Sequence, residues 1–153
     1  RDETSARPTE IQPCRTVLVF RAGRDGRFAL PLSPVARLEE FPAAGIERSL
    51  GREVVQYRGR ILPLVRLAEL LGRQPSDGDD PIVVPTIVCV HDGFALGLII
   101  DRIVDIVETP LRVEPTNGSP GVSGRAIIQG RVTDILDVAD VLDRATAHTG
   151  GRS

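Results

Sequence analysis

The sequence predicts an all-β fold built from two similar β-barrels. Short runs of Val, Ile, Leu and Thr alternate with Gly, Pro and Asp, which is the spacing of strands in a small barrel or sandwich. The second half of the chain repeats the order of runs and turns found in the first. A chain of 153 residues, 41% of them hydrophobic, can bury a core, and that core must be aliphatic because only 3% are aromatic.

Each half begins with a predicted β-hairpin. In the first half "TVLVF" and "RFALPL" are β-branched or apolar runs on either side of Asp25-Gly26. In the second half "TIVCV" and "FALGLII" flank Asp92-Gly93 in the same way. An Asp-Gly pair between two such runs is a strong hairpin signal, because Gly accepts the positive φ of a tight turn.

Further strands and a short helix follow each hairpin. The segments 35–42 and 103–110 alternate apolar and polar residues and end in Pro. "EVVQYRGRILPLVRLAELLG" and "RAIIQGRVTDILDVADVLD" each contain two strand-like runs around a Gly-Arg turn, followed by a helical pattern. Asp137 is the expected N-cap of the second helix, whereas Arg66 takes that place in the first.

The stretch "RQPSDGDDP" (73–81) is rich in turn formers and separates the halves. We expect a first barrel over about 16–72 and a second over about 82–143, with a groove between them. Residues 1–15 are predicted to be a linker or disordered lead-in, and residues 144–153 a disordered tail.

Composition argues against several classes of function. The net charge of −2 provides no global attraction to nucleic acid, and no apolar run approaches the ~20 residues of a membrane helix. All basic residues are Arg, so the lysine of a phosphate-binding P-loop has no counterpart here. We therefore expect no cofactor, no nucleic-acid partner and no direct membrane insertion.

Three patterns are candidates for chemistry, and in each a structural interpretation is favoured. Cys89 and His91 are two residues apart in a predicted strand and therefore lie on one face. They are either half of a metal site or a thiol-imidazole pair, or else a core Cys beside a His at the edge of a turn. "GSPGVSG" (118–124) is either an anion cradle or a barrel loop. Acidic residues recur every third position and form either a cation site or a capped, solvated helix: Asp134, Asp137, Asp140 and Asp143.

The quoted motifs resemble the CheW-like domain, and most closely the C-terminal regulatory domain of the bacterial chemotaxis histidine kinase CheA. The resemblance rests on "RFALPLSPVARLEEFP", "GREVVQYRGRILPLVRLAELLG", "FALGLIIDRIVDIVE" and "AIIQGRVTDILDV", and spans roughly residues 16–143. It implies two pseudo-symmetric, five-stranded SH3-like barrels and a non-catalytic role, since no ATP site is found and neither His91 nor His148 is a credible phosphoacceptor. The alternative that the residues leave open is a free-standing CheW-type adaptor, although Arg66 stands where many adaptors have Asp.

The resemblance also implies partners and a location. The implied partners are a CheW-type adaptor, the cytoplasmic tips of chemoreceptors and the other domains of the parent kinase, in cytoplasmic, membrane-associated receptor arrays. Arg58-Gly59 matches a turn that bears on partner coupling in this family, and apolar side chains nearby suit an interface. Alternation places Ala126, Ile128 and Val132 toward the core. The partner-binding candidates are Phe41, Ile46, Tyr57, Arg58, Gly59, Ile128 and Gln129.

Overall fold

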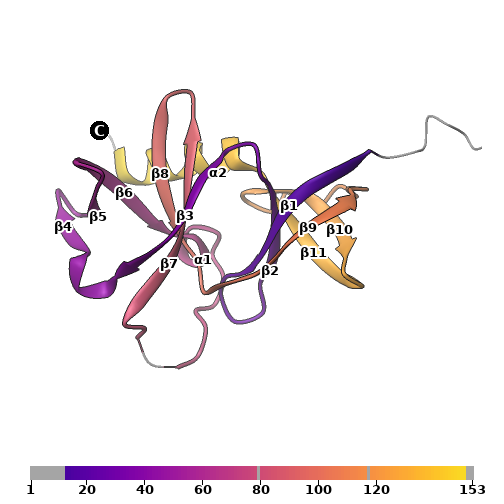
Figure 1. The fold of residues 1–153 in the computed structure, drawn as a ribbon, viewed down its shortest axis with the longest axis horizontal. Coiled ribbons are helices and arrows are strands. Elements are labelled where there is room, and N and C mark those ends of the chain that lie inside the picture. The colour runs from indigo at the N-terminus through magenta and orange to yellow at the C-terminus, as the bar shows by residue number, and fades with distance from the viewer. Residues whose placement is uncertain (1–12, 79, 117, 151–153) are drawn as a thin grey trace, which may run out of the picture.

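The computed structural model describes residues 13–78, 80–116 and 118–150, and the all-β prediction is confirmed (Figure 1). One sheet has five strands in the order β10-β11-β2-β1-β9. Its strands are β1 (Cys14–Arg21), β2 (Arg27–Pro31), β9 (Arg102–Pro110), β10 (Val122–Ile128) and β11 (Arg131–Leu136).

The second sheet has six strands in the order β3-β7-β8-β6-β5-β4. Two helices accompany the sheets, α1 (Leu67–Leu70) and α2 (Val138–Gly150), and a 3-10 turn, η2 (Ala43–Gly45), follows β3. The strands of this sheet are β3 (Val35–Pro42), β4 (Glu47–Ser49), β5 (Arg52–Tyr57), β6 (Arg60–Arg66), β7 (Val83–His91) and β8 (Phe94–Ile99).

The two sheets exchange hairpins between the halves of the chain. The β1–β2 hairpin of the first half pairs with β9 and β11 of the second, and the β7–β8 hairpin of the second half pairs with β3 and β6 of the first. Figure 1 shows the exchange as indigo strands among orange ones and pink strands among purple ones. The repeat in the sequence is therefore a repeat in topology, but the sheets do not follow the expected division at about 16–72 and 82–143.

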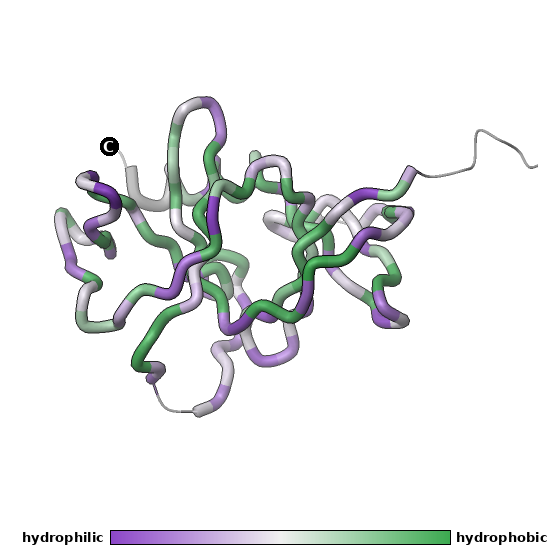
Figure 2. Tube along the Cα trace, in the orientation of Figure 1, coloured by the Kyte–Doolittle hydropathy of each residue, from purple (hydrophilic) through white to green (hydrophobic). Residues whose placement is uncertain are grey.

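Each exchanged hairpin has two apolar faces, so it contributes side chains to two cores. In β1, Val17 and Val19 join the core enclosed by the five-stranded sheet, whereas Leu18 and Phe20 join a larger cluster between the sheets. The β7–β8 hairpin divides its side chains in the same way, so each hairpin has one face in a sheet's own core and the other in the shared cluster. Figure 2 shows hydrophobic residues gathered on the strands where the sheets meet. That shared core fills the space where a groove between barrels was expected.

Curvature nearly closes the five-stranded sheet. Beyond β9, Glu114 and Arg125 of β10 exchange two backbone hydrogen bonds of 2.7 Å each. β10 and β9 are the edge strands of this sheet. Within the described residues, β10 and the segment that follows β9 are connected by this isolated bridge and not by a continuous ladder.

Tight turns with positive φ connect most of the hairpins. Asp92-Gly93 forms the predicted turn, with φ of 53° and 77°. Asp25-Gly26 does not, because five residues connect β1 to β2 and the amide of Ala22 donates to Gly26 O. The segment after β3, which was predicted to be a loop, contains the short strand β4, and β4 pairs with β5. Leu50 lies in the turn between these two strands and adopts a φ of 54°.

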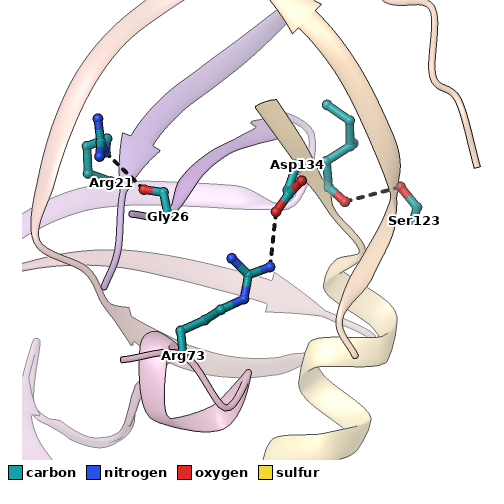
Figure 3. Close-up of polar contacts among 6 residues, drawn as sticks. Arg21, Gly26, Arg73, Ser123 and Asp134 are labelled. Carbon is teal, nitrogen blue, oxygen red and sulfur yellow. Dashed lines mark hydrogen bonds and ion pairs between the residues drawn. The ribbon is translucent and has the colours of Figure 1, made fainter. Parts of the chain in front are cut away.

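The segment after α1 is tied to the five-stranded sheet. Arg73 Nη2 lies 3.0 Å from Asp134 Oδ2 (Figure 3). Its guanidinium carbon lies 5.0 Å from the centroid of the Phe28 ring. The amide of Arg24 donates to Gln74 O at 2.9 Å. These contacts hold the stretch predicted as a separator against the five-stranded sheet, which contains strands of both halves.

The C-terminal helix is longer than predicted. α2 continues to Gly150, where a disordered tail was expected from residue 144, because Val141, Leu142 and Ala145 recur at helical spacing and pack into the shared core. Asp137 caps the helix as predicted, its Oδ1 accepting the Asp140 amide at 3.1 Å. At the other end, residues 1–12 lie outside the described part of the chain.

Candidate functional site

The Arg58-Gly59 turn is held in a defined position by its neighbours. Arg58 and Gly59 adopt φ of 52° and 76°, and the Arg58 guanidinium lies 5.6 Å from the centroid of the Tyr57 ring. That ring meets Phe41 edge-on, with centroids 5.6 Å apart and an interplanar angle of 86°. Ile46 packs against the same cluster, so five of the predicted partner-binding residues come together at one end of the six-stranded sheet.

A carboxylate fixes the polar side of this turn. Tyr57 Oη donates to Glu39 Oε2 at 2.9 Å, and Arg37 Nε donates to the same oxygen at 3.1 Å. The hydrogen bond from Tyr57, followed by that from Arg37, lowers the pKa of Glu39. Burial and the hydrogen bond to Glu39 raise the pKa of Tyr57, so the pair stays as carboxylate and phenol at neutral pH.

An exposed apolar groove runs beside this turn. Its volume is about 920 Å³ and it lies between the tips of the β5–β6 and β7–β8 hairpins. Ile61 is 70% exposed there, and Val90 and Phe94 are each 42% exposed. We define the apolar groove by Tyr57, Ile61, Pro63, Val90, Phe94 and Ala95.

Sequence analysis missed the apolar anchors of this groove. Ile61, Val90 and Phe94 were assigned to strands without a surface role. A usable signal was present, because all three lie within two residues of a tight turn, where a sheet can no longer cover both faces of a strand. Phe41, in contrast, is only 8% exposed and supports the groove from below.

The remaining two predicted residues lie in the other sheet. Ile128 is 1% exposed and packs in the core of the five-stranded sheet, which leaves it inaccessible to a partner. Gln129 occupies the β10–β11 turn with a φ of 55°, and its Nε2 donates to Asp105 Oδ2 at 2.9 Å. Val132 was predicted to face the core but is 62% exposed, because it pairs directly with the outward-facing Ile127 across the turn.

The candidates for chemistry have structural partners. Asp134 pairs with Arg73, Asp137 caps α2, and Asp140 accepts from the Gly121 amide at 2.7 Å and from Arg144 Nε at 2.8 Å. Among the described residues, no three His, Cys, Asp or Glu side chains are grouped as metal ligands would be. Of the glycine-rich stretch 118–124, residues 122–124 belong to β10, and a Cβ at Gly121 would lie 2.5 Å from Leu71 Cδ2, so this glycine permits close packing on the residue that follows α1.

Burial makes Cys89 a poor nucleophile. Its side chain has no exposed surface, and burial raises the pKa of its thiol to about 12. Cys14, on the first residue of β1, is exposed. The thiolate is the reactive form, so a thiol-imidazole pair between Cys89 and His91 has no support.

We expect one thiol per folded chain to react with an aromatic disulfide reagent at about pH 8. Cys14→Ser should abolish that reaction until guanidinium unfolds the protein, after which Cys89 reacts as well. The measurement is the absorbance of released thiolate over time. A folded Cys14→Ser variant that reacts as quickly as the wild type would contradict the assignment of Cys89 to the core.

The fold and the paired hairpins define this chain as a CheW-like domain. The match to that family covers residues 16–146, and the chain belongs to it. Two curated relatives are "Chemotaxis protein CheA" of Treponema pallidum, 30% identical over 82% of this chain, and "Chemotaxis protein CheW" of Thermotoga maritima, 28% identical over 63% of it. The matched regions span 16% of the first relative and 66% of the second.

A solved structure agrees with this assignment at the level of the fold. It is the scaffolding protein TtCheW from Thermoanaerobacter tengcongensis, with a TM-score of 0.65 and 17% identity, covering 81% of this chain and 89% of the other. Within the described residues, neither helix has the length and apolar character that crossing a membrane requires.

Proposed function

We propose that this chain is the regulatory docking module of a chemotaxis histidine kinase, binding a CheW-type adaptor and chemoreceptor tips within membrane-associated arrays. The apolar groove is the observation that supports docking, because large apolar side chains beside a rigid turn are typical of interface anchors. This chain would bind the partners, and other domains of the parent kinase would carry out autophosphorylation.

The choice of a kinase rests on the CheA relative, which matches more of this chain than the CheW relative does. Arg66 also favours it, since the resemblance gives many adaptors an Asp at this place. Here Arg66 makes two hydrogen bonds to Glu53, of 2.8 and 3.0 Å.

A free-standing adaptor is the second candidate. The solved CheW structure, 89% of which this chain covers, favours it. The length of the encoding gene distinguishes the two, because a kinase gene continues through nucleotide-binding and phosphoacceptor regions.

Docking at the groove would bury the side chains of Ile61, Val90 and Phe94, and their burial would stabilise the complex. Each fully buried side chain of this size contributes about 1.5–3 kcal/mol. Arg58 would add a charged contact at the rim at a reduced ordering cost, because its cation–π contact with Tyr57 already restrains it.

The test is equilibrium binding of this chain to the CheW-type adaptor of the same organism, measured by calorimetry. Ile61→Glu and Phe94→Glu should each weaken binding by about tenfold or more, since each places a charge in the centre of the contact. Leu50→Glu is the matched control, because Leu50 is 99% exposed at a different turn. Folded groove variants that bind as tightly as the control would remove the groove from the interface, and no binding by the wild type would remove the proposed partner.

A further inference from the structure

Three arginines gather at the turn end of the five-stranded sheet. Arg21 of β1 lies directly opposite Arg27 of β2, and Arg131 is the first residue of β11. Alternation along each strand places them on the face that carries Val19, Ala29 and Ile135, which belong to this sheet's own core. We call Arg21, Arg27 and Arg131 the arginine cluster.

The hydrogen bonds of the cluster go to neutral oxygens. Arg21 Nε donates to Gly26 O at 3.0 Å, and Figure 3 shows this bond. Arg27 donates to Thr133 Oγ1 and Ile128 O, each at 2.9 Å, and to Gln129 Oε1 at 3.1 Å.

In the part of the chain that the structure describes, no carboxylate pairs with the arginine cluster. Within the described residues, none of its guanidinium nitrogens lies within 4.0 Å of an Asp or Glu oxygen. Asp105 is connected to Arg27 through Gln129. Among the described residues, Asp25, in the loop between Arg21 and Arg27, and Asp101, whose amide donates to Arg21 O at 2.8 Å, form no ion pair with the cluster. Burial, followed by the charges of Arg131 and Arg21, lowers the pKa of Arg27.

Such an arrangement costs the isolated domain stability, because like charges directly opposite on adjacent strands repel. The corresponding end of the six-stranded sheet lacks it. At the tip of the β7–β8 hairpin, His91 pairs with Phe94, and the apolar groove lies beside this tip. The turn ends of the two hairpins therefore present different chemistry, one apolar and one cationic.

The chemistry of the arginine cluster suits a protein partner. Arginine is enriched in protein interfaces, where its guanidinium pairs with carboxylates. The net charge of −2 argues against nucleic acid as the occupant.

We propose that the arginine cluster is a second docking site, which binds an acidic segment of a protein partner, with carboxylates on Arg21 and Arg131. The three hydrogen bonds of Arg27 hold its guanidinium in place before the partner arrives. Guanidinium and carboxylate groups form short, paired hydrogen bonds, so the partner would remove the repulsion that the free domain carries. This inference shares with the proposed function only the premise that the chain docks to another protein.

The test uses a defined probe, the peptide Ac-Glu-Leu-Glu-Glu-Leu-Glu-amide, titrated into the isotopically labelled chain and followed by NMR. Amide shifts should move at Arg21, Arg27 and Arg131 and at the β10–β11 turn, and the affinity should fall as salt rises from about 50 to about 300 mM. A peptide with Gln in place of Glu should produce no such shifts. Arg21→Gln/Arg131→Gln should weaken binding about fivefold or more, whereas the exposed Arg48→Gln in β4 should not.

Thermal unfolding separates a docking role from a structural one. The Arg21→Gln/Arg131→Gln variant should melt at or above the wild-type temperature, because the repulsion between the guanidinium groups is removed. The same variant should bind the probe peptide more weakly. A lower melting temperature with unchanged probe affinity, or equal binding of the Glu and Gln peptides, would overturn the inference. If the probe binds but the adaptor does not, the proposed partner fails and the arginine cluster stands; if the adaptor binds but the probe does not, only the arginine cluster fails.

Discussion

Phe28→Ala should lower the free energy of unfolding by about 3–5 kcal/mol, a large part of the roughly 5–15 kcal/mol typical of a domain. Phe28 is fully buried in the shared core, and its ring stacks on that of Phe20 with centroids 5.6 Å apart. Truncation would leave a cavity between the two sheets and remove the aromatic surface on which the Arg73 guanidinium lies. Urea denaturation followed by circular dichroism measures the change.

Phe94→Ala is the matched control, because Phe94 takes the same place in the second hairpin. It is 42% exposed, so its truncation should cost less than about 1 kcal/mol. Equal losses of unfolding free energy from the two substitutions would contradict the placement of Phe28 in the shared core and of Phe94 at the surface.

A chain divided after Gly78 should give two fragments that do not fold separately but recover the fold when mixed. Residues 1–78 retain β1–β2 without their partners β9 and β11, and residues 79–153 retain β7–β8 without β3 and β6. Each fragment would expose both faces of an apolar hairpin, so neither should show a cooperative thermal transition.

The fragments can be compared with a full-length chain cleaved at an engineered protease site at the same position. That nicked protein should keep its spectrum and melt cooperatively, because no strand contains the cut. A cooperative transition in either isolated fragment would contradict the exchange of hairpins.

Local patterns in the sequence predicted the strands better than their pairing. The Asp92-Gly93 turn and the Asp137 cap follow from the chemistry of single residues, and the structure has both. The exchange of hairpins does not follow, because "TVLVF" and "TIVCV" present similar apolar faces and either can complete either sheet. Only the fit of the shared core distinguishes the arrangements, and that fit depends on distant residues such as Leu67 and Val141.

Turn chemistry in the sequence indicated part of the geometry of the candidate site, whose role in binding stays a prediction. Tyr57, Arg58 and Gly59 surround a turn whose positive φ values the Gly signals, and the structure brings Phe41 and Ile46 to them. Apolar groove residues escaped notice because an apolar residue in a strand is usually buried. The arginine cluster was not predicted either, since the parallel pairing of β2 with β11 is needed to bring Arg131 to Arg21 and Arg27.

The exchange of hairpins has a consequence for synthesis on the ribosome. The six-stranded sheet has all its strands once Ile99 has left the exit tunnel, but β1 and β2, made earlier than the other strands, wait for β11, which ends at Leu136. During that interval the β1–β2 hairpin has open strand edges and an apolar face that the growing polypeptide has not yet covered. Nascent chains should therefore recruit chaperones through β1 and β2, and slow translation between Ile99 and Leu136 should increase aggregation.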